Sequence, residues 1–116
     1  MLQQKKYADA EPLLRECLAV RTKRMPDDWL TFNTRSMLGA ALAGQKKYTD
    51  AEPLLVQGYE GMKQREAKIP TEGKVRLTEV LERLVAHYEA TAQKDKAAAW
   101  RKKLEEWQAE LKKPKP

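Results

Sequence analysis

The sequence contains a single cysteine, Cys17, and a single histidine, His87, among its 116 residues. One cysteine cannot form an internal disulfide bond, and no second cysteine or histidine lies at the spacing of a metal site. Neither residue has a partner in the sequence that would make it a nucleophile or a general base. We therefore predict no catalytic residue, no metal site and no cofactor. We also expect a surface or helix-edge position for His87 and a reducing, cytoplasmic location for the protein.

Long apolar stretches and glycine-rich phosphate-binding motifs are absent as well. No window approaches the roughly 18 apolar residues that a membrane span requires, and the N-terminal residues lack the apolar core of a signal peptide. Neither a GxxxxGK[ST] nor a GxGxxG motif occurs, which excludes nucleotide binding of those two types. The sequence thus predicts a protein that has no membrane partner and is not an enzyme.

Valine and isoleucine are scarce, whereas Ala, Leu, Glu, Lys, Gln and Arg predominate, and this composition favours helix over strand. The formal net charge is +6 at pH 7, and basic residues gather near the two ends, at Lys5, Lys6, Lys112, Lys113 and Lys115. Between the ends, basic and acidic residues are interspersed, so we interpret the charge mainly as solvation of helix faces. Weak binding of a polyanion or nucleic acid through the basic ends is the less favoured alternative.

An eleven-residue segment occurs twice. Residues 4–14 read QKKYADAEPLL and residues 45–55 read QKKYTDAEPLL, so that ten of eleven positions are identical at an offset of 41. A fainter third copy follows at an offset of 46, which places Ala51 on Ala97 and Leu38 on Leu84. Periods of this length are typical of helical solenoids, in which each unit packs on the next.

The apolar residues within each unit follow a helical period. Ala10, Leu13, Leu14, Cys17 and Leu18 are spaced i, i+3, i+4, i+7 and i+8, and the second copy repeats this spacing. We predict helices at about 8–24, 28–43, 49–66, 73–90 and 95–112, in one domain over residues 1–111, followed by a flexible basic tail at 112–116. The first four residues, MLQQ, are interpreted as the last turn of an earlier helix.

The segment SMLGAALAGQKKYTDAEPLL, with its Leu-Gly pair, later tyrosine and Ala-Glu-Pro-Leu-Leu, resembles a tetratricopeptide repeat of the longer, kinesin-light-chain-like type. The resemblance implies an all-α, right-handed superhelix in which five helices form about two and a half repeats. It also implies a non-enzymatic scaffold for protein–protein interaction. Such repeats often occur in larger bacterial proteins, so the chain is expected to be a fragment of one.

In this family the first helix of each pair lines a concave groove. The resemblance therefore implies a peptide-binding groove formed by Asn33, Ser36, Ala40 and Ala43 from one helix and Glu79, Glu82, Ala86 and Glu89 from the next. The small alanines leave room for a bound chain, and the three carboxylates favour lysine or arginine in the ligand. Alternatively, these glutamates only solvate the helix, paired with Arg76 or Arg83 one turn away.

A first repeat that lacks one helix leaves the apolar stripe of the first predicted helix uncovered. The residues concerned are Leu13, Leu14, Cys17 and Leu18, of which Cys17 corresponds to Gly58 at a helix crossing. Apolar patches of a few hundred Å² rarely stay exposed on a monomer. An alternative function is therefore self-assembly, with a homo-oligomer formed through this helix.

Overall fold

The structure is a computed structural model that describes residues 2–113, with side chains from Lys5 onward. The described residues form five α-helices and two short 3₁₀ helices and contain no strand. The α-helices are α1 (Leu2–Arg24), α2 (Trp29–Gly44), α3 (Tyr48–Gln64), α4 (Lys74–Ala90) and α5 (Lys94–Leu111), and the 3₁₀ helices η1 (Glu66–Lys68) and η2 (Thr71–Gly73) lie between α3 and α4. The predicted all-α fold of five helices is thus the one observed.

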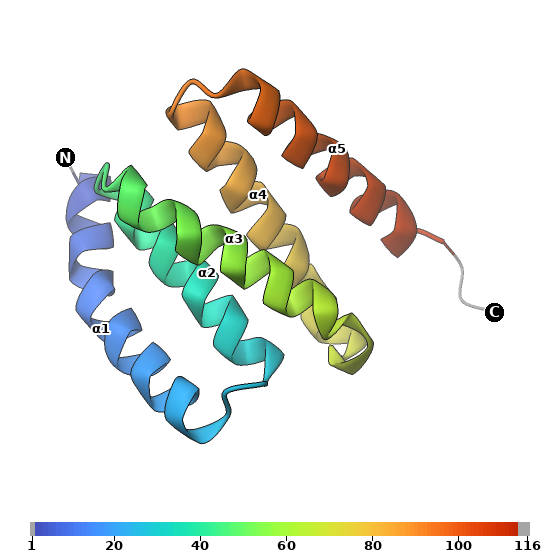
Figure 1. Ribbon diagram of the computed structural model, residues 1–116, viewed down its shortest axis with the longest axis horizontal. Coiled ribbons are helices and arrows are strands. Elements are labelled where there is room, and N and C mark those ends of the chain that lie inside the picture. Colours follow the sequence, from blue (N-terminus) through green and yellow to red (C-terminus); the bar gives the residue numbers. More distant parts are fainter. Residues whose placement is uncertain (1, 114–116) are drawn as a thin grey trace.

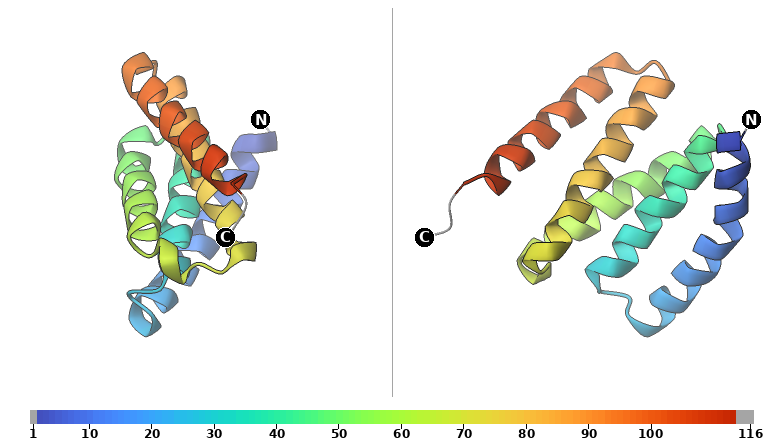
Figure 2. Two further views of the ribbon diagram at one scale, coloured as in Figure 1. Left: turned by 90° about the vertical axis from the view of Figure 1, so that its right-hand side faces the viewer. Right: turned by 180° about the vertical axis from the view of Figure 1, so that it is seen from behind.

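Successive helices run antiparallel and each packs on the next along the chain (Figure 1). Contacts also join α2 to α4, so these two helices are neighbours although α3 separates them in sequence. Seen from behind, α1, α2 and α4 lie side by side (Figure 2). This arrangement is compatible with a solenoid of stacked helix pairs of the tetratricopeptide type. No helix of the described chain is long and apolar enough to cross a bilayer.

The two turns inside the helix pairs have the same backbone geometry. Lys46 and Ala92, 46 positions apart, both adopt the left-handed conformation, with φ of 66° and 58°. The amide of Lys47 donates to Leu42 O at 2.9 Å, and the amide of Gln93, its counterpart, donates to Tyr88 O at 2.9 Å. The carbonyl groups left free at the ends of α2 and α4 are satisfied in this way. The third unit therefore repeats the second at the predicted offset.

The first helix begins earlier than the sequence predicted. Helix α1 starts at Leu2, so the interpretation of residues 2–4 as the end of an earlier helix is wrong, and Met1 lies outside the described residues. The letters QKKY are all helical at residues 4–7, whereas at residues 45–48 the first three form the turn and only Tyr48 is helical, as the first residue of α3. Gly44 ends α2 before the second copy, whereas its counterpart 41 positions earlier is Gln3, a good helix former. Identical letters thus adopt two conformations because the preceding residue and contacts differ.

The core lies where α2, α3 and α4 meet. Its largest fully buried side chains are leucines, joined by Met62 from α3 and Val80 from α4. The leucines are Leu38, Leu42, Leu55, Leu77, Leu81 and Leu84. Asp28 caps the start of α2, since its side chain accepts a hydrogen bond from the amide of Leu30 at 2.9 Å. The core and this cap fix the orientation of α2 and α4, on which the candidate site is built.

Candidate functional site

A pocket of about 240 Å³ lies between α2 and α4, and aromatic side chains from α1 and α3 also line it. Its walls are small residues of the two helices, and its polar groups come from α4. The lining residues are Tyr7, Ala40, Ala43, Gly44, Tyr48, Arg83, Ala86, His87 and Ala90. Three of the eight predicted groove residues, Ala40, Ala43 and Ala86, are therefore brought together at one pocket.

Two predicted groove residues are buried instead of lining the groove. Ser36 has no exposed surface, and its hydroxyl accepts a 3.1 Å hydrogen bond from Arg83 Nη1. Asn33 is also buried, with Nδ2 3.8 Å from Met37 Sδ and with no partner for Oδ1 among the described residues. The expectation that Asn33 and Ser36 face a ligand is therefore wrong. The cause is rotation: one residue along a helix turns the side chain by about 100°.

The three predicted carboxylates differ in their surroundings. Glu79 accepts a 2.8 Å hydrogen bond from Arg76 one turn earlier, which is the pairing that the sequence offered as an alternative. Glu89 forms an ion pair with Arg101 of α5. Glu82 is exposed, and no cation of the described residues lies within ion-pairing distance. The negative charge near α4 is thus partly neutralised, and Glu82 is the one of the three that stays exposed without an ion pair among the described residues.

Arg83 and His87 line the pocket but were not predicted as site residues. Burial lowers the pKa of Arg83, although Glu79 and Glu82 act against this effect. His87 is 3% exposed, which corrects the expected surface position, and its Nδ1 has no hydrogen-bond partner among the described residues. Burial also lowers the pKa of His87, so the ring is neutral at pH 7. The signal in the sequence was the spacing i, i+4, i+7 of Arg83, His87 and Ala90 beside the predicted stripe.

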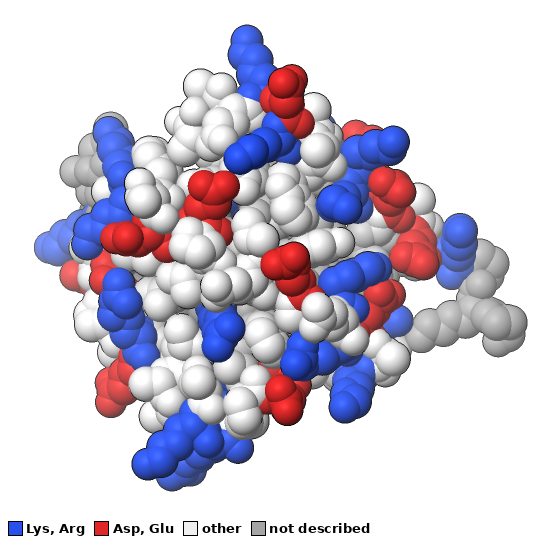
Figure 3. All heavy atoms as spheres, viewed as in Figure 1, with Lys and Arg blue, Asp and Glu red and all other residues white. Residues whose placement is uncertain are grey.

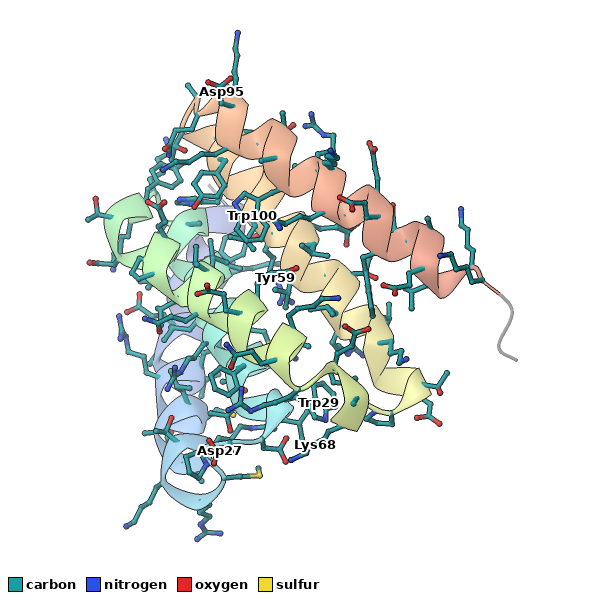
Figure 4. The ribbon with its side chains drawn as sticks, turned by 45° about the vertical axis from the view of Figure 1, so that its right-hand side comes forward. Asp27, Trp29, Tyr59, Lys68, Asp95 and Trp100 are labelled. Carbon is teal, nitrogen blue, oxygen red and sulfur yellow. The ribbon has the colours of Figure 1, made fainter. Side chains whose placement is uncertain are left out.

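A second pocket, of about 230 Å³, opens between α3, α4 and α5. Tyr59, Leu77, Leu81 and Trp107 supply its apolar part, and Lys63, Lys103, Glu106 and Glu110 its charged part. Tyr59 of α3 and Trp100 of α5 lie edge to face beside it, with ring centroids 5.0 Å apart (Figure 4). These rings hold α5 against the core, which is a structural role.

The predicted self-association residues divide between two faces of α1. Leu14 and Leu18 pack against the core cluster. Leu13 is 69% exposed, and Cys17 is intermediate in burial. Helix α2 therefore covers half of the stripe that the sequence predicted to be open.

The basic ends do not form a single patch. The start of α1 and the end of α5 lie on opposite sides of the molecule (Figure 1), so Lys5 and Lys6 are far from Lys112 and Lys113. Lys115 lies outside the described residues. On the face in Figure 3, basic and acidic side chains are interspersed. Within the described range, no group of three or more His, Cys, Asp or Glu side chains is placed to hold a metal ion.

A comparison with protein families agrees with this architecture. The tetratricopeptide repeat model matches residues 1–28, which comprise α1 and the turn that leads into α2. The match supports a tetratricopeptide repeat in the chain, and such repeats generally mediate protein–protein interactions and typically serve as non-enzymatic scaffolds. No curated protein and no solved structure matched the chain.

Proposed function

We propose that the chain is a non-enzymatic scaffold, of the kinesin-light-chain-like kind, that binds an extended segment of another protein along α2 and α4. The observation that supports this proposal is the pocket between these helices, where Ala40, Ala43 and Ala86 leave space open to solvent. Concave, mostly apolar pockets with a few polar groups are typical binding sites.

The shape of the pocket defines the ligand. An apolar side chain of the bound segment enters between the alanines and gains about 0.8 kcal/mol for each buried methylene group. Glu82 is exposed on the same helix, one turn before Ala86, and favours a lysine or arginine next to that side chain. The proposed ligand therefore combines one apolar anchor with a neighbouring basic residue.

The proposal is tested with a library of random dodecapeptides displayed on phage and selected on the full chain. Selected peptides are synthesised, and their affinity is measured by calorimetry for the parent and for the pocket-filling variants Ala43→Leu and Ala86→Leu. We expect at least tenfold weaker binding to both variants. Ala98→Leu, an exposed alanine on α5, is the matched control and should bind as the parent does.

The charge preference has a separate test. Glu82→Lys should weaken binding of the selected peptides that contain lysine or arginine at least severalfold, and it should leave neutral peptides unaffected. Selected peptides that bind the filled variants as tightly as the parent would refute the pocket. Unchanged affinity of basic peptides for Glu82→Lys would refute the charge preference alone.

A further inference from the structure

The interface between α2 and α3 depends on a large residue of α2 and two glycines of α3. The Phe32 ring lies so close to Gly61 that a Cβ atom there would overlap it. A Cβ atom on Gly58 would lie 2.9 Å from Phe32 O and 2.8 Å from Ser36 Cβ. The α2–α3 pair therefore combines a large residue on the first helix with absent side chains on the second.

The equivalent interface between α4 and α5 has the opposite distribution of sizes. At the offset of 46, Thr78 replaces Phe32, while Leu104 and Trp107 replace Gly58 and Gly61. Trp107 is 5% exposed, and its Nε1 donates a 3.0 Å hydrogen bond to Thr78 Oγ1. The large group comes here from the second helix and the small one from the first. In both interfaces, a large side chain on one helix of the pair lies opposite a small residue on the other, so that the space between the helices is filled.

The same face of α1 has no covering helix among the described residues. Its positions, 41 before those of α3, are Ala10, Leu13, Cys17 and Val20, which we call the open face of α1. Val20 is 49% exposed and Leu13 69% exposed, whereas their counterparts in α3, Gly61 and Leu54, are buried and half-buried. The spacing of three, four and three residues is that of a seam between packed helices.

In a second copy, no described helix other than α1 itself offers a free apolar face of this kind. The faces of α2 and α4 that would match are already engaged with α3 and α5. Helix α5 carries Arg101 and Glu105 where α1 carries Leu14 and Leu18, so its outer side is polar. Stacking of copies from head to tail would therefore place charges against an apolar seam, which is costly.

We propose that the open face of α1 is a docking surface for an amphipathic helix that packs on it as α4 packs on α5. On α1, Cys17 and Val20 stand where α3 has Gly58 and Gly61, so their side chains occupy the space that the Phe32 ring needs. A partner helix with phenylalanine at the position equivalent to Phe32 therefore does not fit. The partner helix carries there a residue of the size of threonine or valine. Its remaining contact positions are apolar and follow the same seam spacing. This docking surface is separate from the pocket between α2 and α4.

Two peptides copied from the chain provide matched probes. A fluorescein-labelled peptide of residues 74–93 has threonine at the critical position, and a labelled peptide of residues 28–47 has phenylalanine there. Fluorescence anisotropy measures the binding of each to the full chain. We expect the first peptide to bind at least tenfold more tightly than the second. The double variant Cys17→Gly, Val20→Gly should reverse this preference, because both positions then match Gly58 and Gly61 and admit the phenylalanine ring.

Surface controls locate the binding on α1. Leu13→Lys should abolish binding of the first peptide, whereas Val75→Lys, at an exposed apolar residue of α4, should not change it. Equal binding of the two peptides to the parent, or binding that survives Leu13→Lys, would overturn the proposal. The last measurement is sedimentation equilibrium of the chain alone, for which we expect a monomer. A dimer that Leu13→Lys disrupts would overturn the proposal and assign the open face to a second copy instead.

Discussion

The phenolic hydroxyl of Tyr88, on α4, donates a 2.8 Å hydrogen bond to Glu52 Oε2, on α3. Burial, followed by this hydrogen bond, raises the pKa of Tyr88 to about 12. The bond joins two successive units and lies close to the turn between α4 and α5. Glu11, 41 positions before Glu52, makes the corresponding link, since Gln45 Nε2 donates to its Oε1 at 2.8 Å. The repeated glutamate thus connects each unit with the next.

Removal of the Tyr88 hydroxyl should weaken this connection. Tyr88→Phe keeps the ring in the core but loses the hydrogen bond, so we expect the free energy of unfolding to fall by about 1 kcal/mol. Urea denaturation followed by circular dichroism measures the change. Glu52→Gln keeps an acceptor oxygen and should cost less. Identical unfolding curves for Tyr88→Phe and the parent would show that the bond contributes no net stability.

The contribution of Glu11 to the free energy of unfolding should change with pH in the acidic range. The Arg15 hydrogen bond, followed by that of Gln45, lowers the pKa of Glu11 from 4.5 to about 2. A carboxyl group whose pKa is lowered by folding stabilises the protein above its unfolded pKa, and this stabilisation is lost as the pH falls from 4.5 to about 2. Glu11→Gln should therefore destabilise the protein at pH 7 and have little further effect near pH 2.

Urea denaturation of both proteins at pH 7, 4 and 2.5 tests the Glu11 prediction. The matched control is Glu16→Gln, which changes an exposed carboxylate on the same helix. A difference between Glu11→Gln and the parent that stays constant over the whole pH range would contradict the electrostatic origin of the effect.

His87 should give the protein a second, distinct pH dependence. Burial lowers the pKa of His87 below 6.5, so the unfolded chain takes up a proton before the folded one does. The free energy of unfolding should therefore fall as the pH decreases below 6.5, by at most about 1.4 kcal/mol per pH unit. Because the chain has one histidine, His87→Gln should flatten this slope. Thermal unfolding between pH 5 and 7.5 measures it, and a slope retained in the variant would contradict the assignment.

The left-handed residues Lys46 and Ala92 mark positions where glycine should stabilise the protein. The left-handed conformation costs a residue with a side chain about 1–2 kcal/mol, which exceeds the entropic cost of glycine. Ala92→Gly should therefore raise the free energy of unfolding by about 0.5 kcal/mol. Ala99→Gly, within α5, should lower it by about 1 kcal/mol. A lower stability of Ala92→Gly in urea denaturation would contradict the prediction.

The sequence predicts the five helices well because each has a regular apolar period and most are separated by glycine, proline or aspartate. The prediction fails at residues 4–7. These residues repeat the sequence of the turn that follows Gly44, but no glycine precedes them. Local letters do not determine the conformation there, because the hydrogen bonds of the turn involve Leu42 and Ala43 of the preceding helix.

The candidate groove was predicted in part for a similar reason. Periodicity locates the stripe of a helix that faces the groove only to within about one residue. A shift of one residue decides whether the Ser36 side chain points into the groove or, as observed, toward Arg83. The burial of His87 depends on Tyr48, whose ring centroid lies 5.8 Å away and belongs to a different unit. Such contacts between units do not follow from the period of a single helix.

The exchange of large and small residues between Phe32 and Trp107 has a consequence for how the chain folds. If the repeated units had identical sequences, the first helix of one unit could pair with the second helix of any other unit. Repeat proteins are prone to misassembly of this kind. Here Phe32 would collide with Trp107, and Thr78 opposite Gly61 would leave a void. Each first helix therefore fits its own second helix better than the other one, which disfavours the mispaired arrangements.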